Sequence, residues 1–126
     1  GIATSQAIAD DDGEWLVGTP AYMSPEQAQG KKVDGRSDVY ALGVTLYRLL
    51  TGQLPFSSDS ATSLINAHVD MPIPDIRSVK ANIPSVWQEV VARAMAKDPQ
   101  DRYATAGDFA RDVNEVVSGK WYLRKL

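Results

Sequence analysis

Residues 35–50 read GRSDVYALGVTLYRLL, and apolar side chains follow one another almost without interruption from Val39 onward. A helix that is hydrophobic on most of its sides is typical of a buried position. Gly52 can close such a helix, and Pro55 prevents the helix from continuing. The stretch therefore predicts a central helix of about residues 35–50 that other helices cover.

Further helical patterns flank this central helix. Residues 60–69 predict a shorter helix, and residues 71–84 contain three prolines, which favour an extended connection over the surface. The chain therefore alternates between short helices and irregular connections on the C-terminal side of the central helix.

Two start signals predict the last helices. Ser85 and Gln88 have the spacing of a capping box before an apolar stripe of helical period, and Thr105 with Asp108 resembles the same signal. We expect a mainly α fold with four or five helices around the central one. No internal repeat is found, which counts against a helical solenoid.

Composition limits the classes of function. The 126 residues are 44% hydrophobic and 23% charged, which fits one globular domain or a large piece of one. A net charge of −3 gives no basic face for nucleic acid. Cysteine is absent and His68 is the single histidine, so disulfides and the usual zinc sites are excluded. We expect His68 to be a surface or capping residue without a catalytic role.

Residues 18–26 read GTPAYMSPE and follow neither a helical nor a strand period. Two prolines fix the backbone, and Gly18 permits conformations that other residues avoid. Ser24 can cap a short helix that has Pro25 at its first position and Glu26 at the positive end of its dipole. The pattern predicts a recognition loop that ends in an anchor.

Three separated signals together resemble one known family. They are the Ser24-Pro25-Glu26 anchor, Asp38 in the first turn of the central helix, and the run from Asp98 to Arg102, which reads DPQDR. This combination resembles the C-terminal lobe of a eukaryotic-like serine/threonine protein kinase, whose signatures include an Ala-Pro-Glu motif. Ser24 stands here in place of the alanine.

The resemblance extends along most of the chain. Residues 37–44 are similar to the start of the family's central helix and residues 50–56 to its exit, while Gln27, Ala28 and Gly30 are most similar to the bacterial branch. The implied organisation is a partial activation loop at 1–17, a helical C-lobe subdomain at 18–117 and a tail or linker at 118–126.

The resemblance assigns a substrate-docking role to Gly18, Thr19, Pro20, Ala21 and Tyr22. Thr19 would lie beside the catalytic aspartate and position the acceptor hydroxyl, and Pro20 to Tyr22 would form the pocket for the residue after the acceptor. An ordinary turn with a loop hydroxyl is the plainer alternative for the same residues.

Two further roles follow from the resemblance. Glu26 and Arg102 would form an ion pair that ties the docking loop to the lobe, the alternative being two solvated charges of little energetic value. Asp38 would hold the backbone of the catalytic loop, whereas its position alone suggests a carboxylate that accepts helix N–H groups. Because that loop is absent from the sequence, we expect Asp38 to have a partly unmet requirement for partners.

The region before the docking loop has few phosphorylation sites. Thr4, Ser5 and Thr19 are the possible sites, since residues 7–18 contain no serine, threonine or tyrosine. The carboxylates of Asp10, Asp11, Asp12 and Glu14 occupy the stretch where the family commonly carries a phosphate. They could replace that phosphate, or they could be a solvated acidic run.

Residues 1–3 read GIA and are similar to the continuation of the Asp-Phe-Gly motif, so the resemblance implies a chain that begins at the glycine of that motif. The kinase N-lobe, the lysine and the catalytic and metal-binding aspartates would then be missing. We expect no cofactor or metal in this chain and no activity of the chain alone, with ATP and magnesium used by the intact parent.

The parent would phosphorylate serine or threonine in proteins. The alternative function is a non-catalytic peptide- or partner-docking module, a pseudokinase remnant; an unrelated helical bundle would leave the spacing of the signals unexplained. Expected partners are protein or peptide substrates, the missing N-lobe and further copies of the chain, because truncation uncovers apolar surface.

The chain has no segment of the roughly 20 apolar residues that a membrane span requires. We expect a cytoplasmic protein, or the cytoplasmic part of a membrane kinase if a span follows Leu126. Residues 120–126 mix aromatic and cationic side chains and could approach a membrane surface, or form a frayed tail or a further packing helix.

Overall fold

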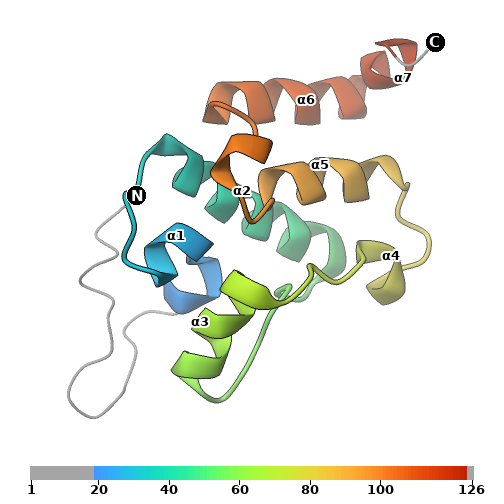
Figure 1. Ribbon diagram of the computed structural model, residues 1–126. Helices are drawn as coiled ribbons and strands as arrows, with labels where there is room; N and C mark the ends of the chain where they lie inside the picture. The colour runs from blue at the N-terminus through green and yellow to red at the C-terminus, as the bar shows by residue number, and fades with distance from the viewer. Residues whose placement is uncertain (1–18, 125–126) are drawn as a thin grey trace.

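The computed structural model describes residues 19–124, which fold into helices joined by loops (Figure 1). No β-strand occurs between residues 19 and 124, so the predicted mainly α class is confirmed. The elements in chain order are η2 (Thr19–Tyr22), α1 (Pro25–Ala28), α2 (Gly35–Thr51), α3 (Ala61–Asp70), α4 (Ile76–Val79), α5 (Val86–Ala94), η3 (Pro99–Asp101), α6 (Ala106–Ser118) and α7 (Lys120–Arg124).

Helix α2 lies at the centre of the fold, as predicted (Figure 1). The Asp34 side chain caps its start by accepting a hydrogen bond from the Arg36 backbone N–H. Gly52, at φ 79°, ends the helix in the left-handed conformation that glycine adopts most easily. The helix therefore begins and ends where the sequence places its signals.

Two hydrophobic cores share α2. The first core joins α2 to α3, α4 and the end of α5, and consists of Tyr40, Val44, Tyr47, Phe56, Ala67, Ile76, Ile83, Val91 and Met95. The second core joins α2 to α5, α6 and α7, and consists of Val39, Val86, Val90, Ala94, Tyr103, Phe109, Val116 and Trp121. Burial of these side chains is the main source of stability in a domain of this size.

Close packing between α2 and α5 depends on glycine at position 43, which has no side chain. A Cβ atom at Gly43 would lie 2.7 Å from Met95 Cγ and 2.8 Å from Ala94 Cβ, well inside van der Waals contact. Glycine at this position allows the two helices to approach and lets the two cores meet across them.

One side of α2 is open among the described residues. Leu42 is 37% exposed and Leu49 is 77% exposed, and the two lie seven residues apart on one face of the helix. The prediction that α2 is covered on most of its sides is therefore wrong for this face, because residues 19–124 provide no element that packs on it.

The prediction of an extended, surface connection over residues 71–84 is also wrong in part. Helix α4 forms within it, with the Asp75 carboxylate accepting a hydrogen bond from the Arg77 backbone N–H at 2.8 Å. Ile76 is completely buried in the first core. The three prolines flank this single helical turn and do not interrupt it, so they permit the helix.

The predicted capping box at Ser85 is not formed. Ser85 has helical backbone angles and makes no side-chain cap, and the Gln88 side chain accepts a hydrogen bond from the Ile76 backbone N–H at 2.8 Å. Gln88 therefore provides the acceptor for a backbone N–H at the start of α4. At α6 the predicted cap is confirmed, since Thr105 Oγ1 accepts a hydrogen bond from the Asp108 backbone N–H.

The C-terminal end forms a further packing helix. Gly119, at φ 85°, ends α6, and α7 follows directly with Trp121 buried in the second core. Within α6, Phe109 and Val116 are buried while Val117 is 72% exposed. Among the helices of residues 19–124, none combines the length and apolar character that a membrane span needs.

Candidate functional site

The segment from Thr19 to Ala28 forms two short helical turns that pack against α2 and α3 (Figure 1). Ser24 Oγ accepts a hydrogen bond from the Gln27 backbone N–H, and Gln27 Oε1 accepts one from the Ser24 backbone N–H at 2.9 Å. The predicted cap is thus present, with Pro25 at the first helical position. The reciprocal bond from Gln27 was not predicted; it completes a capping box and makes the turn rigid.

Glu26 and Arg102, predicted to interact, lie together in the interior. Glu26 is 6% exposed and Arg102 is 3% exposed. Arg102 Nη1 contacts Glu26 Oε2 at 2.5 Å and Arg102 Nη2 donates to Oε1 at 2.8 Å, the two-point geometry that makes such pairs strong. The pair joins positions 76 residues apart in the sequence.

The remaining hydrogen-bonding groups of this pair are also satisfied. The Arg102 guanidinium donates to the backbone carbonyl oxygens of Ala96 at 2.7 Å, Arg36 at 3.1 Å and Lys97 at 3.2 Å. Ser37 Oγ donates to Glu26 Oε2 at 2.6 Å. All five N–H donors of an arginine are thereby used, which is the condition for burying its charge at acceptable cost.

The electrostatics of Glu26 follow from these contacts. Burial alone would raise the pKa of its carboxyl, but hydrogen bonds from Arg102 and Ser37, together with the guanidinium charge, lower the pKa below its ordinary value. Glu26 is therefore ionised at neutral pH and remains paired. Sequence reasoning missed Ser37, whose small hydroxyl on an apolar helix carried no distinctive signal.

The structure describes part of the segment that is predicted to dock a substrate. Pro20 and Ala21 are buried, and Tyr22 is half-buried with its hydroxyl accepting a hydrogen bond from Arg48 of α2 at 3.0 Å. Thr19 begins η2, but its side chain lies outside the described part of the chain. The predicted positions Gly18, Thr4 and Ser5, and the acidic residues 10, 11, 12 and 14, also lie outside the described residues.

Asp38 lies in the first turn of α2, where the sequence placed it. Its side chain is exposed, and it is not without an interaction partner. An exposed carboxylate is also hydrated, so it avoids the cost of a lone buried charge. The expected partial shortage of protein partners stays a prediction.

The expectation for His68 is wrong. His68 is completely buried, and its Nδ1 lies 2.7 Å from the Tyr40 hydroxyl oxygen. Its position near the end of a short helix suggested the surface, but α3 packs against the first core and encloses the ring between Tyr40 and Phe56. Pairing with a tyrosine hydroxyl 28 positions away gave no signal in the sequence.

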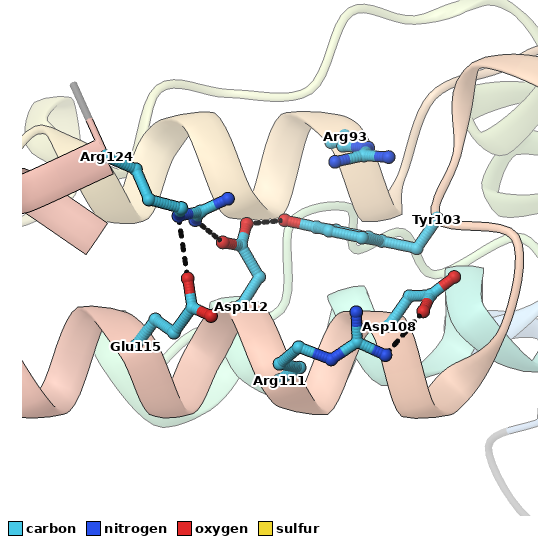
Figure 2. Close-up of a pocket in the computed structure, with 7 residues that line it drawn as sticks. All are labelled: Arg93, Tyr103, Asp108, Arg111, Asp112, Glu115 and Arg124. Atoms are coloured by element: carbon cyan, nitrogen blue, oxygen red, sulfur yellow. Dashed lines mark hydrogen bonds and ion pairs between the residues drawn. The ribbon is translucent and has the colours of Figure 1, made fainter. Parts of the chain in front are cut away.

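A second group of polar residues lines an open pocket of about 260 Å³ between α5, α6 and α7 (Figure 2). Asp112 accepts hydrogen bonds from the Tyr103 hydroxyl and from Arg124 Nη2, both at 2.5 Å. Arg124 Nε also lies 2.7 Å from Glu115 Oε1, an ion pair without good hydrogen-bond angles.

The other cations of this pocket are also engaged. Arg111 pairs with Asp108 at 3.0 Å, and the Arg93 guanidinium lies over the Tyr103 ring at 4.2 Å (Figure 2). Three arginines face three carboxylates, so the pocket has no net charge to attract an ion. Its contacts attach α7 to α6, and we assign it a structural role.

The described residues contain no cluster of metal-ligating side chains. Within residues 19–124 no group of three or more histidine, cysteine, aspartate or glutamate side chains could hold a metal ion. The buried carboxylate next to the docking segment, Glu26, is already engaged by Arg102 and Ser37.

Comparison with known proteins agrees with this geometry. The family model described as "Protein kinase domain" matches residues 1–121. The probable serine/threonine-protein kinase PknB of Bifidobacterium longum is 44% identical over 104 residues, which are 82% of this chain and 15% of that protein.

Two other bacterial relatives give the same picture. The serine/threonine-protein kinase PknH of Mycobacterium tuberculosis H37Rv is 45% identical over 81% of this chain and 16% of its own length. The serine/threonine-protein kinase Pkn1 of Myxococcus xanthus is 48% identical over 82% of this chain and 15% of its own length. The chain thus spans about one sixth of the length of these relatives.

Proposed function

Because this chain belongs to the protein kinase domain family, we propose that it is the substrate-docking part of a kinase that transfers the γ-phosphate of ATP to serine or threonine in proteins. The helical fold agrees with the C-lobe of that family. The proposed division is a partial activation loop at 1–17, the helical C-lobe subdomain at 18–117 and a C-terminal tail or linker at 118–126. The proposed location is the cytoplasm.

One observation carries this proposal. The buried pair between Glu26 and Arg102 fixes the end of the docking segment to the helical core, and its position matches the Ala-Pro-Glu anchor of the family. A loop that must present a substrate needs a rigid base, because a displacement of about 1 Å can reduce catalysis by two orders of magnitude. A completely satisfied buried pair provides such a base.

The residues of the docking segment then have distinct proposed roles. Thr19 positions the acceptor hydroxyl, and Pro20, Ala21 and Tyr22 form the surface that receives the next residue of the substrate. Asp38 is proposed as the anchor of the catalytic-loop backbone. These residues position a substrate, whereas the phosphates, magnesium and the general base would be held by kinase residues other than those described here.

A phosphoryl-transfer assay tests the proposal. The full gene product that includes this chain and the 126-residue chain alone are each incubated with ATP carrying a labelled γ-phosphate and a serine- and threonine-containing protein. We expect label on serine or threonine with the full product and none with the chain alone. A full product that binds the protein substrate without labelling it would favour the non-catalytic docking module instead.

We also propose that the isolated chain associates with itself through the open face of α2. Leu42 and Leu49 expose apolar side chains there, and exposed apolar surface promotes association. Light scattering over a range of concentrations should show a mass above 13.7 kDa that falls in the Leu49→Lys variant. Val117→Lys, at an equally exposed position on α6, is the matched control and should not change the mass.

A further inference from the structure

Arg48 of α2 contacts the docking segment with its charged end. It lies in the last turn of the helix and is exposed to solvent, and its Nη1 donates a hydrogen bond to the Tyr22 hydroxyl at 3.0 Å. The helix dipole favours a cation in this turn wherever its side chain points, so the dipole alone does not account for the contact with Tyr22. The contact places a positive charge at the edge of the surface that is proposed to receive a substrate.

No carboxylate of residues 19–124 forms an ion pair with Arg48. Four other arginines in this part of the chain do contact carboxylates, namely Arg36, Arg102, Arg111 and Arg124. The Tyr22 hydroxyl is a neutral acceptor and takes one of the five N–H donors of the guanidinium. The positive charge and further donors of Arg48 are therefore available to a partner that approaches from solvent.

Tyr22 holds the guanidinium in a defined position. The Tyr22 side chain is half-buried and packs against the first core, so its hydroxyl is a fixed acceptor. An arginine that is already fixed loses less conformational entropy when it binds a ligand than a freely moving one. Its planar fork of donors fits the two oxygens of a carboxylate. The arrangement is therefore suited to an acidic side chain.

We infer that Arg48 is a specificity-determining residue that selects substrates with an acidic side chain close to the acceptor serine or threonine. Thr19 is proposed to position the acceptor, and the four residues of η2 from Thr19 to Tyr22 rise about 6 Å. An extended peptide covers this distance in about two residues, so Arg48 can meet a side chain near the acceptor. The inference rests on the proposed function, since it takes this segment as the one that binds substrate.

Steady-state kinetics of the full gene product test the inference. Pairs of serine-containing peptides carry aspartate or lysine at each position neighbouring the serine in turn. At one or more positions wild type should prefer the aspartate peptide about fivefold in kcat/KM. Arg48→Glu should reverse the preference at the same position, and Arg48→Gln should abolish it. A wild type without preference, or a preference that both variants keep, would overturn the inference.

Two further variants show whether the effect belongs to this site. Arg111→Glu makes the same change of charge at an exposed arginine of the polar pocket between α5, α6 and α7 (Figure 2), and it should leave the preference unchanged. Tyr22→Phe should weaken the preference, because the guanidinium loses its fixed position. An equal shift in Arg111→Glu would assign the preference to net charge. Equal losses for all peptides in Arg48→Gln and Tyr22→Phe would leave Arg48 a purely structural contact, and either outcome overturns the inference.

Peptide binding gives a readout that does not depend on phosphoryl transfer. Fluorescence anisotropy is measured with the full gene product and labelled peptides in which alanine replaces the acceptor serine. Wild type should bind the aspartate peptide more tightly than the lysine peptide, with a difference that falls as salt screens the charges, and Arg48→Glu should reverse the order. This reversal in a product that labels no protein would support the inference and contradict the proposed phosphoryl transfer. Labelling of proteins without any charge preference would contradict the inference alone.

Discussion

Arg102 and Arg124 both pair with carboxylates, but they do so in opposite surroundings. Counting the side chain alone, Arg102 is completely buried and Glu26 is 7% exposed, whereas Arg124 is 55% exposed. Arg102 connects residues 76 positions apart, and Arg124 connects α7 to Asp112, 12 positions away on α6. An arginine–carboxylate pair therefore connects distant parts of the tertiary structure in one region. In the other region it connects two neighbouring helices at the surface.

The two pairs differ in whether water can solvate a charge that has lost its partner. At Arg124 water can solvate either partner if the pair opens, so the net gain is small. At Arg102 the loss of either partner leaves a charge in the interior with few groups to compensate it. The position of the docking segment therefore depends on the buried pair far more than the position of α7 depends on the exposed one.

Arg102→Ala should have the largest effect on stability. It leaves the Glu26 carboxylate and three backbone carbonyls without their donor, and breaking a buried pair in this way costs about 3–5 kcal/mol. Urea denaturation followed by circular dichroism measures the change in the free energy of unfolding. A loss of less than about 1 kcal/mol would mean that the pair behaves like an exposed one.

A double replacement separates the cost of an orphaned charge from the value of the pair. Glu26→Leu with Arg102→Met removes both charges and keeps apolar volume, so it should restore much of the stability lost in Arg102→Ala. The full gene product carrying this double replacement should still lose activity, because the docking segment is no longer anchored. Recovery of both stability and activity would show that apolar packing alone positions the segment.

The sequence was sufficient for the parts of the fold that depend on local signals. Gly52 and Thr105 end or begin helices through their own backbone or side-chain chemistry, and the pairing of Glu26 with Arg102 followed from the family resemblance. Each of these features is determined by a few neighbouring residues or belongs to a motif of the family.

The rest depends on contacts between distant residues. Gln88 has the spacing of a helix cap, but its side chain accepts a hydrogen bond from the Ile76 backbone N–H of another helix. The sequence of residues 85–88 alone does not show that Ile76 is the partner. His68 is buried because α3 meets Tyr40 and Phe56 in three dimensions. The close approach at Gly43 is likewise a property of two helices, so its need for glycine appeared only with the structure.

Protonation of Glu26 in acid should lower the free energy of unfolding by less than Arg102→Ala does. The pKa of Glu26 is lowered in the folded state, so its contribution is fully present above the ordinary value of 4.5 and is lost as the pH falls through the lowered value. The free energy of unfolding of wild type minus that of Glu26→Gln should therefore decrease below pH 4.5. Subtracting the variant removes the titration of other carboxyl groups, and a difference that stays constant with pH would show that Glu26 is not stabilised by its partners.

Arg124→Ala should have the smallest effect, about 0–1 kcal/mol, because its guanidinium is mostly exposed and Trp121 still buries α7 in the second core. The same urea denaturation, repeated at high salt, should show an even smaller difference from wild type, since salt screens exposed charges within a few ångströms. The Arg102→Ala difference should hardly respond to salt, because ions do not enter the interior. If the Arg124 effect equalled that of Arg102 and resisted salt, burial would not be what distinguishes the two pairs, and the network with Asp112 and Tyr103 would have to act cooperatively instead.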